Sequence, residues 1–405
     1  MINRRKALKS LATLPFIGSF LGANSLAANP SSAAIVSSVR RDFFKELGLR
    51  TFINAAGTYT SMTGSLMPKE VTDAISYGTT EYVNLDELQD KVGERIAELL
   101  ECEYATVSSG CFGAMSIGMA GILTGMDPKK VKQLPNTEGM RNEVIIQESH
   151  TIGYAQALTN VGAKVVKIKT ARALEKAINK NTAMLWFLNA NTDQGAIKCE
   201  EFIALGKKYN IPTFIDCAAD VPPVENLFKF TKMGFDLVAF SGGKGIRGPQ
   251  SAGLLLGKRK YIEAARMHTP PRGETIGRGM KVNKEEVLGM LAALELYLQK
   301  DHKAEWAMWE AQIKLISDSA LKIKGVETEV HVPKYANHVP SLRIRWNQNL
   351  VKITPNEVRD QLKNGHPSIQ TVGDNSTVGI TTWMMVPGQE RVVATRINEI
   401  LSSAT

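Results

Sequence analysis

Short apolar runs alternate with helix-like segments through the middle of the chain. From about residue 64, runs of β-branched and aliphatic residues are separated by segments whose apolar residues recur every three or four positions. The strand-like runs read YATVSS, NEVIIQ, AKVVKIK, TAMLWFLN, IPTFIDC, DLVAFS and SAGLLLG. Strands that alternate with helices over nearly two hundred residues predict an α/β fold with a mostly parallel sheet, covered on both faces.

The pattern changes near residue 284. A long helix-like stretch begins there, and short strand-like runs (ETEVHV, SLRIRW, TVGI) and two further helix-like segments follow it. We therefore expect a large domain over residues 64–283 and a smaller C-terminal α+β domain over residues 284–405.

The first 27 residues have a different character. Arg4 and Arg5 precede a modestly apolar segment that ends in small residues at 25–27, which resembles a twin-arginine export signal. The resemblance implies passage through the twin-arginine translocase and a periplasmic location, or a cytoplasmic one if the signal is not functional; a disordered basic tail is the alternative. Pro15 and Gly18 interrupt the apolar segment, so we expect no stable membrane insertion. Residues 28–63 are expected to form a linker and an N-terminal segment.

Composition and charge narrow the function classes. The chain has 405 residues, of which 43% are hydrophobic and 22% charged, and its net charge is +9. The first 27 residues supply four of these charges and no long basic run follows, so no nucleic-acid partner is expected. The four cysteines show neither metal-ligand spacing nor the density of a disulfide scaffold, so no metal site is predicted.

One lysine stands in an unusual setting. Lys244 lies in a glycine-rich turn, FSGGKGIRG, between two apolar runs. A lysine amine held near buried strands can form a Schiff base with an aldehyde cofactor such as pyridoxal phosphate. Ser241 and the glycines beside it would let the backbone approach a phosphate closely. An ordinary exposed turn lysine is the alternative.

An acid ends another predicted strand. Asp216 closes IPTFID and is followed by small residues, including Ala218. This carboxylate can keep a pyridine nitrogen protonated, and Ala218 would let a flat ring lie close to the chain. A helix-capping aspartate is the simpler explanation.

Three more candidate binding positions follow predicted strands. The stretch SSGCFGA opens a glycine-led helix, where backbone amides and a serine hydroxyl can hold a phosphate. His150 can stack on a cofactor ring and assist proton transfer, although a lone histidine is usually structural. Asn189 can bond the phenolic oxygen of the cofactor. All of these places fall at the carboxyl ends of predicted strands, where ligands bind in open α/β sheets.

The candidate phosphate turn, stacking residue, acid and lysine follow one another along the chain in the order found in fold-type I pyridoxal-phosphate enzymes. Within that class, DLVAFSGGKGIRGPQSAGLLLGKRKYIEAA and IPTFIDCAADVPPVENLFKF resemble the lysine and aspartate segments of the bacterial selenocysteine synthase (L-seryl-tRNA selenium transferase) family and its relative, D-glucosaminate-6-phosphate ammonia-lyase. INAAGTYTSMTGSLMPKEV and IGRGMKVNKEEVLGMLAALELYL also resemble this family. The resemblance covers about residues 45 to 300 and implies the fold-type I fold.

The resemblance also assigns roles. It makes Lys244 the Schiff-base lysine and Asp216 the partner of the pyridine nitrogen, with His150 on the ring. It assigns further residues to the cofactor: Ser109, Gly110, Cys111 and Ser241. The loop 267–281 and the position three residues after the lysine supply residues for a phosphate or a substrate acid: Arg272, Thr275 and Arg278 from the loop, and Arg247 beside the lysine. It further implies a homodimer or larger homo-oligomer.

The expected function is a pyridoxal-phosphate enzyme acting on an amino acid or amino-sugar acid. We expect α,β-elimination that releases ammonia, while racemisation and transamination stay open because pocket shape decides among them. A selenium transferase acting on a tRNA-bound serine is an alternative, but the RNA-handling N-terminal domain of that family is not seen here. The non-enzyme alternative is an exported ligand-binding protein that has lost catalysis.

Overall fold

The computed structural model describes residues 41–405. The predicted export signal and the chain up to residue 40 lie outside the described residues. The chain divides after Arg50 into two units, and the described part of the first contains one short helix, α2 (Phe43–Glu46). Asp42 caps α2, since its carboxylate accepts a hydrogen bond from the Lys45 amide at 3.0 Å.

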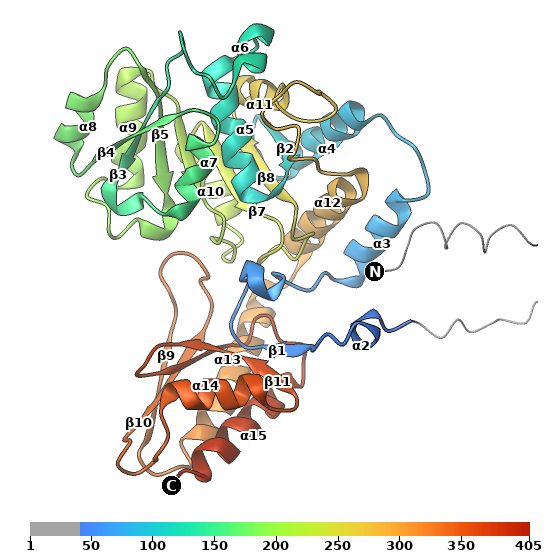
Figure 1. Cartoon of the computed structure of the whole chain (residues 1–405), viewed down its shortest axis with the longest axis vertical. Helices are drawn as coiled ribbons and strands as arrows, with labels where there is room; N and C mark the ends of the chain where they lie inside the picture. Colours follow the sequence, from blue (N-terminus) through green and yellow to red (C-terminus); the bar gives the residue numbers. More distant parts are fainter. Residues whose placement is uncertain (1–40) are drawn as a thin grey trace, which may run out of the picture. The chain divides into compact units, whose positions relative to one another are not determined.

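A seven-stranded sheet forms the centre of the second unit, residues 51–405 (Figure 1). Its strands, in spatial order, are β2 (Tyr104–Ser108), β8 (Gly253–Gly257), β7 (Leu237–Ser241), β6 (Thr213–Asp216), β5 (Thr182–Leu188), β3 (Glu143–Gln147) and β4 (Lys164–Ile168). Only β8 runs antiparallel to its neighbours in this sheet. Each strand coincides with one of the seven predicted runs, and the mostly parallel sheet is confirmed.

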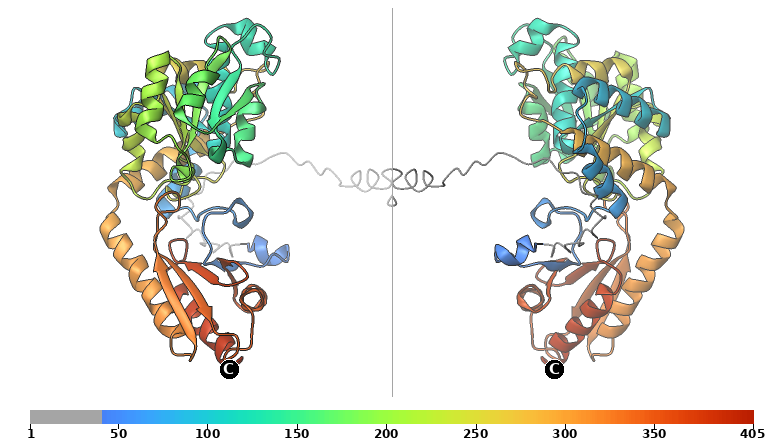
Figure 2. Two further views of the ribbon diagram at one scale, coloured as in Figure 1. Left: turned by 90° about the vertical axis from the view of Figure 1, so that its left-hand side faces the viewer. Right: turned by 90° about the vertical axis from the view of Figure 1, so that its right-hand side faces the viewer.

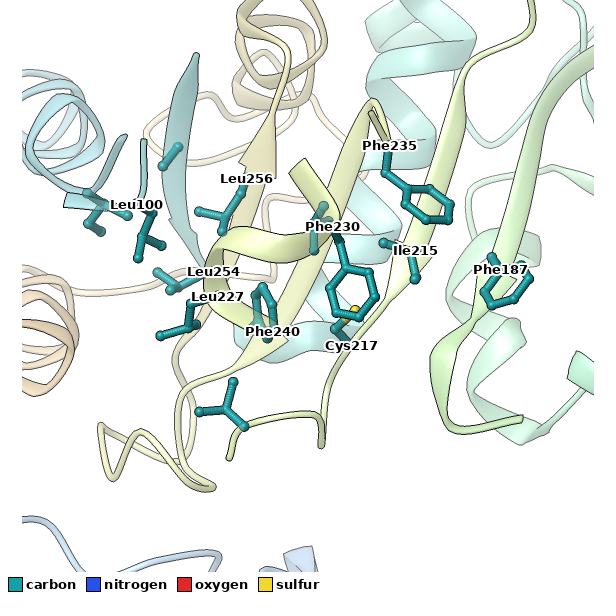
Figure 3. Packing of buried hydrophobic residues seen from close by; sticks show 14 of the residues in the cluster. Leu100, Phe187, Ile215, Cys217, Leu227, Phe230, Phe235, Phe240, Leu254 and Leu256 are labelled. Atoms are coloured by element: carbon teal, nitrogen blue, oxygen red, sulfur yellow. The ribbon is translucent and has the colours of Figure 1, made fainter. Parts of the chain in front are cut away.

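Helices cover both faces of this sheet. On one face, aromatic residues such as Phe187, Phe230 and Phe240 pack in a single buried cluster (Figure 3). The helices that contribute to this cluster are α4 (Leu85–Leu99), α8 (Ala171–Ala177), α9 (Cys199–Tyr209), α10 (Asn226–Met233) and α12 (Lys284–Gln299). The other face is covered by α5 (Gly110–Thr124), α7 (Gln156–Thr159) and α11 (Arg259–Arg266), and α6 (Pro128–Gln133) contacts α5. Helix α5 is apolar on all sides because it is buried along most of its length.

The long helix-like stretch after residue 284 is two helices. Helix α12 ends at Gln299, Lys300 is extended, and α13 (His302–Ala320) begins after it. Asp301 caps α13, because its carboxylate accepts a hydrogen bond from the Ala304 amide at 2.9 Å. The periodicity continues through this break, so the pattern of apolar residues alone did not reveal it.

The C-terminal part carries a second, antiparallel sheet of four strands. In spatial order they are β12 (Val372–Gly373), β13 (Val378–Thr381), β10 (Ser341–Trp346) and β9 (Val326–His331). Leu342, Ile344 and Ile380 on one face are fully buried in a cluster with α13, α14 (Pro355–Asn364) and α15 (Gln389–Ser402). Side chains alternate along a strand, so Ser341 and Arg343 belong to the opposite face.

The segment before residue 64 belongs partly to this second sheet region. Strand β1 (Phe52–Asn54) pairs in parallel with β11 (Ser368–Gln370), more than three hundred residues away in the sequence. The 3₁₀ turn at Thr60–Met62 and helix α3 (Lys69–Gly78) then lead to the large sheet, as Figure 2 shows from both sides. The sequence predicted only a linker and an N-terminal segment here, since three residues are too few to show a period. A search of residues 41–405 for a helix with the length and apolarity of a membrane span finds none.

Candidate active site

Close backbone contacts fix the turn that carries Lys244. The Gly242 amide donates to the Ala252 carbonyl and the Gly248 amide donates to the Gly242 carbonyl, both at 2.9 Å. A Cβ atom on Gly243 would lie 2.4 Å from Gln250 Cα, and one on Gly245 would lie 2.1 Å from the Val221 carbonyl oxygen. The glycines are therefore required by packing, and they hold the partly buried Lys244 in a rigid frame.

Asp216 ends β6 as a buried carboxylate. Its residue is 3% exposed. Oδ1 accepts hydrogen bonds from the Ala218 amide at 2.9 Å and from the Cys111 thiol at 3.4 Å. Burial raises the pKa of Asp216, while the nearby Lys244 opposes that shift. Among the described residues the carboxylate has no ion-pair partner within 4 Å, so no neighbouring cation in this part of the chain neutralises it.

The amino end of α5 lies next to this acid. Ser109 is the residue before the helix, and Gly110 has a φ of +68°, a conformation that favours glycine. The amides that begin a fifteen-residue helix favour an anion. Cys111 joins this turn to Asp216 through its thiol, and burial raises the pKa of that thiol well above its ordinary value. The four cysteines are all free thiols in the structure.

A cavity of about 440 Å³ opens beside Lys244. Most of its other lining residues come from three parts of the chain: the loop 56–60, the loop that follows β9, and the four-stranded sheet. Asn54 holds the loop 56–60 in place, because its side-chain oxygen accepts from the Gly57 amide and its amide group donates to the Gly57 carbonyl, both at 2.9 Å. The Lys244 amine thus faces a space large enough for a small substrate.

Aromatic and backbone contacts hold the His150 ring in place. Its residue is fully buried, and its ring packs edge-on against Phe187 at 4.4 Å between centroids. Nδ1 accepts from the Leu188 amide at 3.2 Å, and Nε2 lies 3.1 Å from the Asn191 carbonyl oxygen. Burial lowers the pKa of His150 to about 4, so the ring is neutral at physiological pH. His150, like Asp216, does not line the cavity beside Lys244, and its stacking on a cofactor stays a prediction.

Asn189 connects to an acid that the sequence did not reveal. Asp220 is 3% exposed, interacts with the Asn189 side chain and accepts from the Ala336 amide at 3.0 Å. Burial raises the pKa of Asp220 to about 6. The nearby Asn337 amide donates to the Ala219 carbonyl at 2.7 Å. The turn after Asp216 is therefore joined to the loop that follows β9, a contact that no sequence spacing could indicate.

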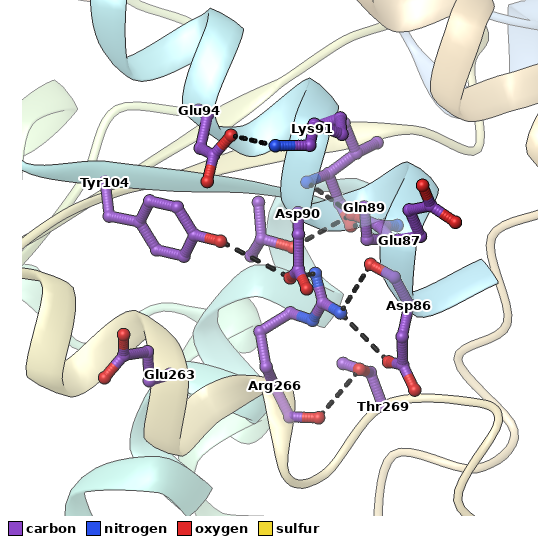
Figure 4. Close-up of polar contacts among 12 residues, drawn as sticks. Asp86, Glu87, Gln89, Asp90, Lys91, Glu94, Tyr104, Glu263, Arg266 and Thr269 are labelled. Atoms are coloured by element: carbon purple, nitrogen blue, oxygen red, sulfur yellow. Dashed lines mark hydrogen bonds and ion pairs between the residues drawn. The ribbon is translucent and has the colours of Figure 1, made fainter. Parts of the chain in front are cut away.

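The arginines predicted for the substrate are largely engaged elsewhere. Arg247 donates to the Trp383 carbonyl at 2.6 Å. Arg272 pairs with Asp86 at 3.1 Å, next to the Arg266 ion pairs in Figure 4. Arg278 is exposed and Thr275 donates to the His268 carbonyl at 3.0 Å. None of these four predicted residues lines the cavity beside Lys244, so their roles stay predictions.

The sequence did not identify the residues of the four-stranded sheet that line the cavity. His331, Arg343 and Thr381 belong to three neighbouring strands and share the cavity face. The only available signal was the alternation in SLRIRW, which indicates a polar face but not what that face meets.

Comparison with known proteins gives a partial family match and two relatives of similar sequence. Residues 154–341 match the family model of SelA, L-seryl-tRNA selenium transferase. D-glucosaminate-6-phosphate ammonia lyase of Salmonella typhimurium is 25% identical over 377 residues, which cover 90% of this chain and 99% of that protein. The L-seryl-tRNA(Sec) selenium transferase of Alkaliphilus oremlandii is 25% identical over 290 residues, 64% of this chain and 58% of that enzyme.

Solved structures agree with these relatives. The structure of a D-glucosaminate-6-phosphate ammonia-lyase superposes with a TM-score of 0.79 at 24% identity, covering 90% of this chain and 99% of the other. A serine palmitoyltransferase variant from S. paucimobilis with a bound PLP–myriocin aldimine superposes with a TM-score of 0.54 at 12% identity, covering 87% and 88% of the two chains. The prediction of the fold is confirmed: the chain has the fold-type I architecture of pyridoxal-phosphate-dependent enzymes.

Proposed function

We propose that this protein is a pyridoxal-phosphate-dependent enzyme of the selenocysteine synthase-like group. It acts on an amino acid or amino-sugar acid and catalyses an α,β-elimination that releases ammonia. The observation that carries this proposal is the placement of Lys244 on a rigid turn at a cavity, close enough to the buried Asp216 to influence its pKa. The relatives agree, since one of them is named as an ammonia lyase and spans 90% of this chain.

The residues present fit the cofactor. Asp216 offers a buried negative charge to the pyridine nitrogen, with Ala218 beside it. Ser109, Gly110, Cys111 and Ser241 surround the amino end of α5 and the end of β7, where a phosphate would be held. Asn189 lies next to Asp220 at the end of β5. When bound, pyridoxal phosphate supplies an aldehyde for the lysine amine and an electron sink for a developing carbanion.

Within this proposal, the chain itself contributes proton transfer. Lys244 carries the only side-chain amine among the residues that line the cavity, so it is the residue to move the α-proton of the substrate. The loop 56–60 and the loop after β9 form part of the cavity wall around this residue. Asp216 keeps its charge when it gains a cationic partner, which counteracts the effect of burial.

The transferase reaction is less well supported. The match to the A. oremlandii enzyme leaves 42% of that enzyme's length uncovered, because 58% is covered.

Racemisation and transamination need the same lysine and acid as elimination does, so product analysis must distinguish these reactions. A ligand-binding protein without catalysis would not need a free lysine amine beside a buried carboxylate. Assembly into a homodimer or larger oligomer also stays part of the proposal.

The decisive test is spectroscopic and chemical. The purified protein with pyridoxal phosphate is expected to show a visible absorbance band that borohydride abolishes. D- and L-amino acids and amino-sugar acids, including D-glucosaminate 6-phosphate, are then screened for a band shift and for release of ammonia with a keto acid. Lys244→Ala should lose the band, whereas Lys260→Ala, an exposed lysine over the Tyr261 ring, should keep it. A reducible band in Lys244→Ala would refute the lysine assignment.

A further inference from the structure

The cavity wall opposite the large sheet is built from polar residues on strands. Register pairs His331 with Ser341 and Ser341 with Thr381, so these three residues form one row across β9, β10 and β13. The next row on the same face contains Glu329, Arg343 and Gly379. Four of these six residues carry side chains that line the cavity beside Lys244: His331, Ser341, Arg343 and Thr381. Groups held on strands are positioned more rigidly than groups on loops.

Two polar atoms on this wall lack partners. Thr381 is 8% exposed, and its Oγ1 is buried without a hydrogen-bond partner among the described residues. The same holds for Nδ1 of His331. A buried polar atom without a partner costs free energy, so such atoms are usually satisfied by a ligand or a water molecule. Both atoms belong to residues that line the cavity, so the wall around Arg343 has unused hydrogen-bonding capacity.

Arg343 supplies the charge. Its guanidinium has one ion pair, a loose contact to Glu329 of 3.5 Å in which both side chains are 47% exposed. Exposed pairs of this kind contribute little stability, so the guanidinium can turn toward a ligand at low cost. Gly379 pairs with Arg343 on the other side and places no side chain beside it.

One acidic residue lines the described cavity, and its carboxylate is already hydrogen-bonded. Asp374 also lines the cavity, but its Oδ1 accepts from the Ser376 amide at 2.8 Å, from the Ser376 hydroxyl at 2.7 Å and from the Thr377 hydroxyl at 3.1 Å. These bonds tie the acid into its own turn. Arg343 therefore remains the charged group on this wall that is available to a ligand.

We infer that Arg343, together with Thr381 and His331, binds an anionic group of the substrate, a carboxylate or a phosphate, distal to the amine that reacts at Lys244. The inference rests on the proposed function and names the substrate class of the same site. A guanidinium suits this task because it binds a carboxylate or a phosphate through two parallel hydrogen bonds. The cavity of about 440 Å³ also accommodates a longer substrate such as an amino-sugar acid.

Binding of probes without an amine isolates this site from the cofactor. D-gluconate carries only a carboxylate, D-glucose 6-phosphate carries only a phosphate, and D-gluconate 6-phosphate carries both. Their dissociation constants are measured by calorimetry on the purified protein loaded with pyridoxal phosphate. Arg343→Gln is expected to weaken binding of D-gluconate 6-phosphate by roughly 10- to 100-fold, since hydrogen bonds to charged groups are the strong ones. The single-anion probe that loses the most affinity identifies which anion Arg343 holds.

Arg345→Gln is the matched control. Arg345 lies two residues further along β10, on the same face, and pairs with Glu327 at 3.0 Å, but it does not line the cavity. It should change binding by less than about twofold. Thr381→Val, which keeps the shape and removes the hydroxyl, should weaken binding by a few-fold. Arg343→Lys keeps the charge and should retain part of the affinity, which separates charge from loss of folding.

Three results would overturn the inference: wild-type protein that binds none of the probes, Arg343→Gln that binds as wild type does, or an equal loss in Arg345→Gln. Failure of the proposed function looks different. In that case the wild type shows no absorbance band with pyridoxal phosphate, while binding of the anion to protein without cofactor still depends on Arg343.

Discussion

The Cys111 thiol donates a hydrogen bond to Asp216 Oδ1 across 3.4 Å, which joins the amino end of α5 to the carboxyl end of β6. The two residues are 105 positions apart in the sequence. This contact brings the predicted phosphate turn and the predicted acid together at one edge of the sheet. It also defines the first test, because the thiol and the carboxylate can be changed separately.

Asp216→Asn is expected to retain the cofactor and to lose most turnover, on the order of 100-fold or more. The amide keeps the shape but cannot keep the pyridine nitrogen protonated. Absorbance titration with pyridoxal phosphate and the steady-state rate measure the two effects. Cys111→Ala leaves the carboxylate in place and should cost less than about tenfold; a larger loss than in Asp216→Asn would assign the chemistry to the thiol.

Asp220 makes stability depend on pH. Burial raises its pKa to about 6, above the value of about 3.9 expected in an unfolded chain. Protonation therefore favours the folded state, and this contribution is present below about pH 4 and lost as pH rises through about 6. Lys244 lowers and Asp216 raises the pKa of this group.

Asp220→Asn should remove that dependence. The wild type is expected to lose roughly 2 kcal/mol of stability relative to Asp220→Asn between pH 4 and pH 7. Thermal unfolding of both proteins across this range measures the difference. Parallel curves for the two proteins would show that the carboxyl group titrates normally.

Arg247 is expected to act through stability. Its guanidinium bonds the Trp383 carbonyl and lies 3.9 Å from Glu305, which is buried. Arg247→Gln should lower the free energy of unfolding by about 1–3 kcal/mol, since it leaves buried acceptors unsatisfied. Binding of the probe anions should stay within about twofold. Unchanged melting with weaker substrate binding would instead support the role that the resemblance assigned to Arg247.

The glycine turn gives a further prediction. A Cβ atom at Gly245 would meet the Val221 carbonyl at 2.1 Å, so Gly245→Ala must move backbone. We expect a loss of roughly 3 kcal/mol in stability and a much weaker cofactor band. Gly273→Ala is the control, because a Cβ there meets nothing within 4 Å. Equal effects of the two changes would remove the packing explanation.

Export of the protein is proposed from residues that the structure does not describe. Replacing Arg4 and Arg5 by lysine should retain the protein in the cytoplasm, as measured by cell fractionation. A matched replacement of Lys6 by arginine preserves the charge and should leave export unchanged. Periplasmic recovery that does not respond to the arginine changes would remove the twin-arginine proposal.

The sequence by itself determined the sheet and the position of its chemistry. Six parallel strands and the antiparallel β8 are readable because most of them are buried and therefore appear as continuous apolar runs bounded by turns. Lys244 and Asp216 are conspicuous because a charged residue at the end of such a run is not explained by packing. Local patterns of this kind are written within a few neighbouring residues, so a single sequence contains them.

Only the tertiary structure decided which residues from distant parts of the chain are in contact. The pairing of β1 with β11, the burial of His150 against Phe187 and the contact of Asp220 with Ala336 join residues from distant parts of the chain. Arg343 acquires its place in the cavity in the same way, because β10 shows which residues share a face but not which domain that face opposes. Long-range packing fixes such contacts, and a periodicity that extends over a few residues cannot encode them.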